Sequence, residues 1–129
     1  MIVLDASVAI EILLHTSVGI RSANALTDED VHAPHLLDLE FTQALRRLTF
    51  SSDLDENMAE LALDELSVWR IERHAHTDFL RRIWQLRHSV SAYDACYVAL
   101  AEELGAPLMT CDAKLSRSRG HRAKIVLLS

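Results

Sequence analysis

The chain has 129 residues, of which 50% are hydrophobic and 25% charged, a composition that suits one compact domain spanning residues 1–129. With only 3 glycines and 2 prolines, it matches neither a disordered chain nor a β-sandwich with many turns. The formal net charge is -6, and two cysteines exclude a disulfide framework and indicate a reducing compartment, the cytoplasm.

Apolar runs bounded by turn or capping residues predict five strands, at residues 2–4, 31–33, 68–71, 107–111 and 125–128. Helical periodicity predicts helices at residues 6–14, 17–27, 35–50, 55–66, 77–88 and 92–104. Because parallel strands need helical crossovers, this alternation favours an α/β fold with a mostly parallel sheet covered on both faces over an all-helical bundle. We expect no signal peptide and no membrane segment, since Asp5 and Glu11 interrupt the first apolar stretch.

Two acidic residues directly follow predicted strands. Asp5 comes after residues 2–4, and Asp112 comes after residues 108–111. Ligands of open parallel sheets gather beyond the carboxyl ends of the strands, so both side chains are candidates for a functional site. The alternative is that each acid simply caps the helix that follows it.

Two further acids lie on the apolar faces of predicted helices. Glu40 and Asp94 each share a helical stripe with hydrophobic neighbours, whereas Asp38 lies on the opposite side and is expected in solvent. An ionised carboxylate in an apolar stripe is costly unless it has a partner. For Asp94 the alternative is a capping box with Ser91, and for Glu40 it is an ion pair with a basic side chain.

A divalent cation is the simplest partner for four carboxylates that meet at one edge of a sheet. An all-oxygen ligand set selects Mg²⁺ or Mn²⁺ over Zn²⁺. Two histidine stretches, at residues 32–35 and 74–76, do not have the spacing of zinc motifs, so we expect no zinc site from either of them. Cys111 has no evident activating base and is interpreted as a small buried thiol rather than a nucleophile.

Three segments carry a resemblance to a known family: MIVLDASV at the start, APHLLDLEFTQALRR in the first third and SVSAYDACYVALAEELGAPLMTCD in the last third. With the apolar strand near the C-terminus, they resemble PIN-domain ribonucleases of the VapC-like toxin type, from bacterial toxin-antitoxin pairs. The resemblance implies a single PIN-like domain with a five-stranded parallel sheet of order 3-2-1-4-5. It also implies RNA cleavage with Mg²⁺ or Mn²⁺ held by Asp5, Glu40, Asp94 and Asp112. Ser7 and Thr110 match positions that hydrogen-bond this acidic cluster.

The same resemblance implies partners. A cognate antitoxin would inhibit the toxin by placing a basic side chain in the acidic site, and the assembly would include a homodimer and a toxin-antitoxin hetero-oligomer. The RNA substrate would be tRNA or rRNA, cut to leave a 5′-phosphate. One departure is that the segment after Asp112 lacks a further acid that some relatives use.

Two other functions stay open at this point. The first is a catalytically weak PIN-like module that acts mainly by binding its antitoxin and an operator. The second is a phosphoacceptor domain of receiver type, which is also α/β and also places acids around Mg²⁺ at strand ends.

The C-terminal segment is strongly basic. Residues 113–129 contain five basic residues and no acidic one, in a chain that is acidic overall. Because this segment follows Asp112 directly, we expect Lys114, Arg117 and Arg119 to bind phosphates of RNA. The alternative is an ordinary charged surface in solvent.

Overall fold

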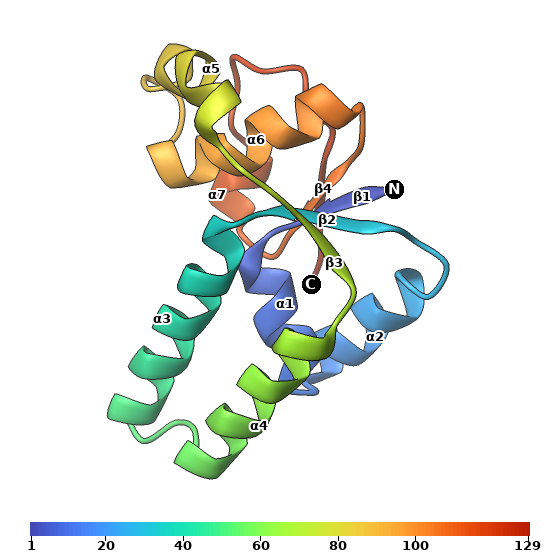
Figure 1. Cartoon of the computed structure of the whole chain (residues 1–129), viewed down its shortest axis with the longest axis vertical. Coiled ribbons are helices and arrows are strands. Elements are labelled where there is room, and N and C mark those ends of the chain that lie inside the picture. The colour runs from blue at the N-terminus through green and yellow to red at the C-terminus, as the bar shows by residue number, and fades with distance from the viewer.

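The computed structural model describes residues 1–129 and contains one parallel sheet of five strands in the order β3-β2-β1-β4-β5 (Figure 1). The strands are β1 (Ile2–Leu4), β2 (Val31–Pro34), β3 (Ile71–His74), β4 (Leu108–Thr110) and β5 (Ile125–Leu127). The expected α/β fold with sheet order 3-2-1-4-5 is therefore confirmed. A receiver domain has the order 2-1-3-4-5, so the observed topology excludes that alternative.

Helices cover both faces of the sheet (Figure 1). Helices α1 to α4 lie on one side, while α5 and α6 lie on the other. The helical elements are α1 (Ala6–Leu13), α2 (Ser17–Ala25), α3 (Leu36–Phe50), α4 (Glu56–Val68), the 3₁₀ turn η1 (Thr77–Phe79), α5 (Leu80–Gln85), α6 (Ala92–Leu104) and α7 (Ala113–Ser116). None of these helices has the combination of length and apolar character needed to cross a membrane.

The structure corrects two of the predicted elements. The strand predicted at residues 68–71 is wrong, because α4 continues to Val68 and the strand occupies Ile71–His74. Val68, at the end of α4, is 82% exposed and does not belong to the strand. The apolar run spans the end of a helix and the start of a strand, and apolar periodicity does not mark the boundary between them. The helix predicted at residues 77–88 is divided between η1, α5 and a turn, and α7 was not predicted.

Local contacts explain where several helices begin and end. The Thr16 hydroxyl accepts a hydrogen bond from the Gly19 N–H at the start of α2. A side chain at Gly19 would overlap the backbone carbonyl of Glu11, so the glycine lets α2 pack directly on α1. Helix α6 ends at Gly105, whose φ of 61° is the left-handed conformation that glycine adopts without strain.

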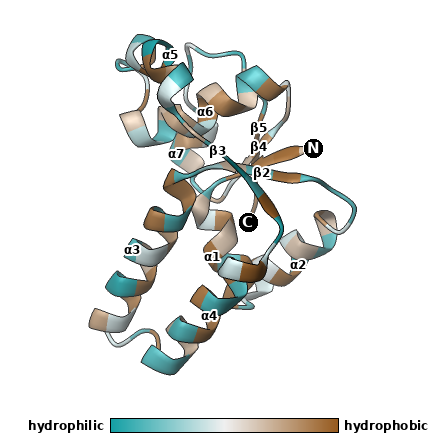
Figure 2. Cartoon of the chain, viewed as in Figure 1, coloured by the Kyte–Doolittle hydropathy of each residue, from teal (hydrophilic) through white to brown (hydrophobic).

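The core occupies both faces of the central strands, and α6 is the most deeply buried helix. All three residues of β1 are buried, and Figure 2 shows this strand in hydrophobic colours. Every residue of α6 from Ala95 to Ala101 is buried, because this helix packs across β1, β2 and β4. The middle of α6 is therefore surrounded by protein, whereas its first turn, which carries Asp94, is partly exposed.

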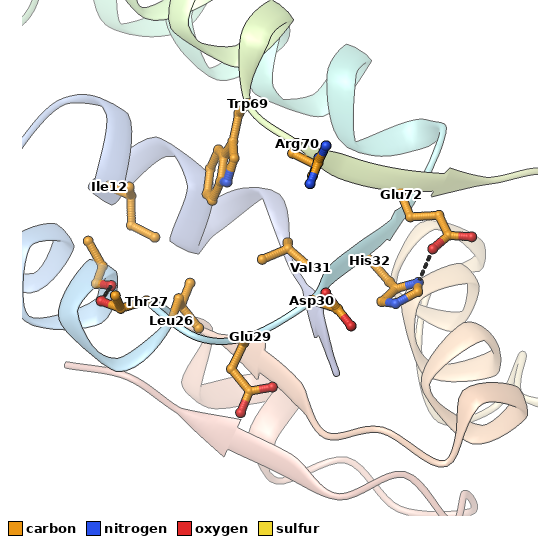
Figure 3. Close-up of a pocket in the computed structure, with 11 residues that line it drawn as sticks. Ile12, Leu26, Thr27, Glu29, Asp30, Val31, His32, Trp69, Arg70 and Glu72 are labelled. Carbon is orange, nitrogen blue, oxygen red and sulfur yellow. Dashed lines mark hydrogen bonds and ion pairs between the residues drawn. The ribbon is translucent and has the colours of Figure 1, made fainter.

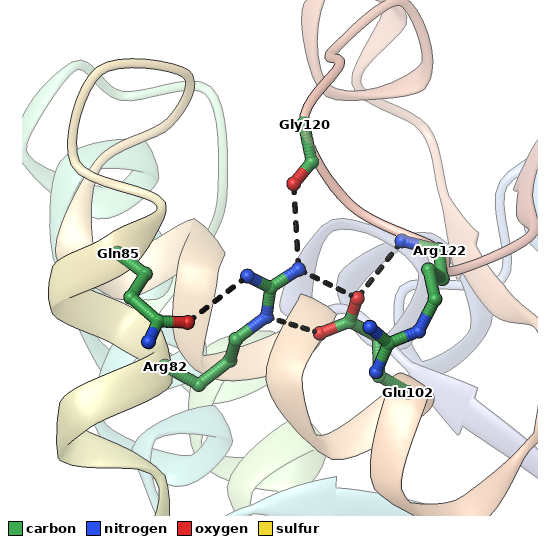
Figure 4. Close-up of polar contacts among 5 residues, drawn as sticks. All are labelled: Arg82, Gln85, Glu102, Gly120 and Arg122. Atoms are coloured by element: carbon green, nitrogen blue, oxygen red, sulfur yellow. Dashed lines mark hydrogen bonds and ion pairs between the residues drawn. The ribbon is translucent and has the colours of Figure 1, made fainter.

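A buried ion pair fastens α5, α6 and the basic C-terminal segment together (Figure 4). Arg82 donates to both carboxylate oxygens of Glu102, at 2.8 and 2.9 Å. The same carboxylate accepts the backbone N–H of Arg122 at 2.8 Å, and Arg82 also reaches the carbonyl oxygen of Gly120 at 3.3 Å. The Glu102 side chain is only 5% exposed, and hydrogen bonding by Arg82 lowers its pKa.

Replacing Arg82 with alanine removes both charged donors from this nearly buried carboxylate. We expect the free energy of unfolding, measured by urea denaturation at neutral pH, to fall by about 1–3 kcal/mol. Arg81→Ala is the matched control, because Arg81 is exposed and forms no ion pair, and it should change the free energy by less than about 0.5 kcal/mol. Equal losses in the two variants would contradict a stabilising role for the pair.

The contribution of this pair depends on pH in a defined direction. Because the pKa of Glu102 is lowered in the folded chain, the stabilisation is complete above the ordinary glutamate pKa of about 4.3. It is lost as the pH falls through the lower folded-state value. The stabilities of the wild type and Arg82→Ala should therefore converge in acid, and a difference that persists unchanged would refute the assignment.

Candidate active site

Asp5 lies at the end of β1, where its carboxylate is held by two hydroxyl groups. Oδ2 accepts hydrogen bonds from the Thr110 hydroxyl at 2.6 Å and from the Ser7 hydroxyl at 2.9 Å. Asp5 occupies the N-cap position of α1, but its side chain makes no capping hydrogen bond, so the capping alternative is wrong for this residue. Asp5 and Thr110 are both buried, which makes these charge-assisted bonds strong.

The same two hydroxyls position the end of β4. The Ser7 hydroxyl accepts the backbone N–H of Cys111, and the Thr110 hydroxyl accepts that of Asp112, each at 3.0 Å. Ser7 and Thr110 therefore hydrogen-bond the acidic cluster as the resemblance implied. Together they join the loops that follow two neighbouring strands.

Asp112 caps the short helix α7. Its Oδ1 accepts the backbone N–H groups of Lys114 at 2.8 Å and Leu115 at 3.3 Å. The capping alternative is thus confirmed for Asp112. Its Oδ2 makes no hydrogen bond within the protein, and Asp112 is close enough to Asp94 to raise the pKa of that residue.

Glu40 on α3 has a hydrogen-bond donor from α6. The Tyr97 hydroxyl, on a side chain that is fully buried, donates to Oε1 of Glu40 at 2.7 Å. Burial, together with the charges of Asp5 and Asp94, raises the pKa of Glu40, and the hydrogen bond from Tyr97 opposes this rise. The basic partner considered for Glu40 is absent, and no local pattern in the sequence points to Tyr97 as its partner.

Asp38 lies in the first turn of α3, on the opposite face of this helix from Glu40, and it does have a basic partner. Arg73 of β3 donates to its two carboxylate oxygens at 2.7 and 2.9 Å. The Asp38 side chain is 40% exposed, so it reaches solvent as expected, but it is also held in an ion pair. The pair attaches α3 to the edge strand of the sheet.

Asp94 lies in the first turn of α6, where Ser91 caps the helix. The Ser91 hydroxyl accepts the backbone N–H of Asp94 at 3.1 Å, which is the first half of the capping box considered from the sequence. Burial raises the pKa of Asp94, and the charges of Asp5 and Asp112 raise it further. A position in a helix cap and an interaction with other acids therefore coexist at this residue.

These four carboxylates form one electrostatically coupled cluster. Asp5 interacts with Glu40 and with Asp94, and Asp94 interacts in turn with Asp112. No three of them bring ligand atoms within 4.8 Å of one another, so they do not form a closed shell around a single point. An open set of oxygen ligands fits Mg²⁺ or Mn²⁺, which are bound through a few carboxylates and keep water in their remaining positions.

Cys111 is a poor nucleophile in this setting. Its side chain is partly buried, and burial together with the charges of Glu11 and Asp5 raises its pKa. The reactive thiolate is therefore disfavoured, in agreement with the interpretation of Cys111 as an unreactive thiol.

A basic groove opens beside Asp94. It has a volume of about 640 Å³, and its lining includes Lys114, Arg117 and Arg119 together with Arg87 from the turn after α5. The three basic residues singled out from the C-terminal segment thus share one groove with a member of the acidic cluster. Arg87 could not be distinguished in sequence from other exposed arginines on helices.

A second groove, of about 1040 Å³, runs between α1 and α3 and is largely apolar. Asp5 and Glu40 are among the residues that line it. Leu39 and Tyr93, which also line it, are 71% and 63% exposed. The acidic cluster is therefore in contact with an exposed apolar surface on one side and a basic groove on the other.

Comparison with known proteins gives consistent matches. Residues 2–120 match the PIN domain family. The chain is 39% identical to Ribonuclease VapC12 of Mycobacterium tuberculosis over 129 residues, covering 100% of both chains, and 38% identical to Ribonuclease VapC1 of the same organism, covering 98% of this chain and 96% of that one. Its fold is similar to that in the crystal structure of VapBC2 from Rickettsia felis bound to a promoter DNA fragment, with a TM-score of 0.70, 14% identity and full coverage of both chains.

Replacing Asp94 with asparagine tests whether burial and the neighbouring acidic charges make its ionised carboxylate unfavourable. Because the pKa of Asp94 is raised in the folded chain, its ionised form is less favourable there than in the unfolded chain. In a metal-free buffer with a chelator, we expect Asp94→Asn to increase the free energy of unfolding by about 0.5–2 kcal/mol. Asp64→Asn, at an exposed position of α4, should leave it unchanged. A less stable Asp94→Asn variant would show that burial and neighbouring charge do not disfavour the ionised Asp94.

Proposed function

The chain belongs to the PIN domain family, and on that premise we propose that it is a VapC-like toxin that hydrolyses RNA phosphodiester bonds with the help of a divalent cation. The observation that carries the proposal is the cluster of four coupled carboxylates at the ends of β1 and β4 and on two helices. The full-length similarity to proteins named as VapC ribonucleases supports the same activity.

Asp5, Glu40, Asp94 and Asp112 would hold the cation, which is Mg²⁺ or Mn²⁺. When bound, such an ion neutralises charge on the phosphate and lowers the pKa of water. The donor set supports this assignment, because burial and neighbouring acids raise the pKa values of Glu40 and Asp94, and a divalent cation stabilises such carboxylates in their ionised form.

Three neutral side chains would keep the acidic residues in place during the reaction. Ser7 and Thr110 donate to one oxygen of Asp5, and Tyr97 donates to one oxygen of Glu40. In each case the remaining carboxylate oxygen is free of these donors. The hydroxyls thus orient the carboxylates and leave an oxygen available to the cation.

The basic groove would hold the RNA backbone. Lys114, Arg117 and Arg119 are exposed and line the same groove as Asp94, so phosphates bound there lie next to the acidic cluster. Phosphate contacts of this kind give affinity and register without reading the base sequence. We assign tRNA or rRNA as the substrate class, since single-stranded loops of folded RNA present phosphates and bases together.

A cognate antitoxin would occupy the apolar groove between α1 and α3. Exposed Leu39 and Tyr93 offer an apolar surface to an amphipathic segment of the partner. Asp5 and Glu40 line the same groove, so a basic side chain of the antitoxin can compete with the cation there. We propose that the protein acts in the cytoplasm. The proposed assembly with the antitoxin includes a homodimer of the toxin.

The activity is tested by incubating the purified, antitoxin-free chain with total cellular RNA, with and without Mg²⁺ or Mn²⁺. We expect discrete fragments that require the cation and that disappear with a chelator. Asp94→Asn should reduce the cleavage rate by at least about a hundredfold, because it removes a charged group from the reacting site. Thr110→Val, which removes one of the two hydroxyl donors to Asp5, should reduce the cleavage rate by about tenfold or more.

Asp64→Asn serves as the control and should cleave like the wild type. If the wild type and Asp94→Asn are both inactive in folded preparations, the chain is instead a binding module that acts through its antitoxin and operator. Cleavage that Asp94→Asn leaves intact would place the active site elsewhere.

RNA binding is tested in the Asp94→Asn background, which leaves the RNA uncut. Changing Lys114, Arg117 and Arg119 to alanine should weaken binding and make it less sensitive to salt. For single-stranded RNA, the slope of log K against log salt concentration should become less steep by about 2, since each phosphate contact contributes about 0.7. Filter binding or fluorescence anisotropy across a salt series measures this slope.

A variant with Arg21, Arg70 and Arg81 changed to alanine loses the same charge from exposed positions outside the groove. It should keep the wild-type slope. If both triple variants lose the same slope, overall charge rather than this groove governs RNA binding.

A further inference from the structure

Two histidines and a glutamate converge on one face of the sheet, outside the acidic cluster. They are His32 of β2 and Glu72 and His74 of β3, and they form the one group of three potential ligands whose donor atoms all lie within 4.8 Å of one another. In the parallel register His32 pairs with Glu72, and alternate residues of a strand share a face, so Glu72 and His74 both point to the side of His32.

The distances within this trio suit a shared ion. His32 Nδ1 lies 2.9 Å from His74 Nε2 and 3.6 Å from Glu72 Oε2. Two ligands of one Zn²⁺ ion with bonds of about 2.0–2.1 Å are separated by roughly 2.9–3.4 Å, depending on the coordination geometry. The centroids of the two imidazole rings are 5.2 Å apart, and the close approach of His32 Nδ1 and His74 Nε2 brings one nitrogen of each ring into the same small region.

Two neutral imidazoles satisfy this arrangement poorly. A hydrogen bond between two neutral imidazole nitrogens uses one N–H, and a carboxylate only accepts. If Nδ1 of His32 donates to His74, Glu72 must share that same proton. If His74 donates instead, the lone pair of His32 faces the carboxylate. A cation placed among the three atoms interacts favourably with all of them.

The surroundings favour a cation as well. Asp30, His32 and Glu72 line a cavity of about 580 Å³, and Arg70 is the one Lys or Arg side chain in its lining (Figure 3). Glu29 also lines this cavity, but it is paired with the N-terminal ammonium of Met1. The His32 side chain is 8% exposed and the Glu72 side chain 68%, so the trio has one fixed ligand and one ligand at the solvent boundary. An ion can therefore enter from the solvent and keep water in its remaining positions.

We propose that His32, Glu72 and His74 form a binding site for a transition-metal ion, Zn²⁺ in particular. Two imidazoles and one carboxylate are ligands that Zn²⁺ prefers, whereas the all-oxygen acidic cluster suits Mg²⁺ or Mn²⁺. The ion would link the edge strand β3 to β2, so that its binding stabilises the folded chain. This site does not depend on the proposed ribonuclease activity.

The experiment uses the full chain without a histidine tag, stripped of metal and dialysed against micromolar free Zn²⁺. We expect the wild type to bind one Zn²⁺ per chain. We expect His74→Gln to bind it at least about tenfold more weakly. Zn²⁺ should raise the melting temperature of the wild type and not that of His74→Gln. Glu72→Gln, at an exposed position that folding does not require, should also weaken binding.

His76→Gln is the matched control, because His76 is a nearby exposed histidine outside the trio. It should bind Zn²⁺ like the wild type, and so should Asp94→Asn, which alters only the acidic cluster. The proposal is overturned if the wild type binds no Zn²⁺ under these conditions. It is equally overturned if His74→Gln and Glu72→Gln both bind Zn²⁺ with wild-type affinity.

Discussion

The hydrogen bond from Thr110 to Asp5 joins the carboxyl ends of the neighbouring strands β4 and β1, and the rest of the site is arranged around it. A buried carboxylate is costly unless it is hydrogen-bonded, and Thr110 and Ser7 supply the donors. The same hydroxyls hold the backbone of Cys111 and Asp112, so the loops after both strands are fixed to one another.

The buried and partly buried acidic residues of this chain differ in whether a basic side chain neutralises them. Glu102 is neutralised by Arg82, and that ion pair anchors α5 and the basic segment to α6. Asp94 and Glu40 instead face other acids and have raised pKa values. Uncompensated charge lowers the stability of the folded chain, and proteins typically tolerate this at functional sites. The contrast distinguishes Glu102, which links parts of the fold, from the carboxylates that are proposed to bind the cation.

Much of the fold was predictable because helical and strand periods are local. Apolar runs located four of the five strands and the main helices, and the helical period placed Glu40 and Asp94 on inward faces. The strand at residues 68–71 was wrong because the apolar residues of a helix end and a strand start adjoin there. The partner of Asp38 was missed, because Arg73 lies on an edge strand far away in sequence.

By itself, the sequence determined the α/β class and the resemblance to a family, and it singled out the four acids as candidates, since each depends on short segments or a local period. Only the tertiary structure decided which side chains complete the site. Tyr97 reaches Glu40 across 57 residues, and His32 reaches His74 across 42. Histidine spacing within each stretch predicted no metal site, yet strand pairing brought one histidine from each stretch together. Contacts between distant strands and helices arise from packing, which leaves no periodic signal in either segment.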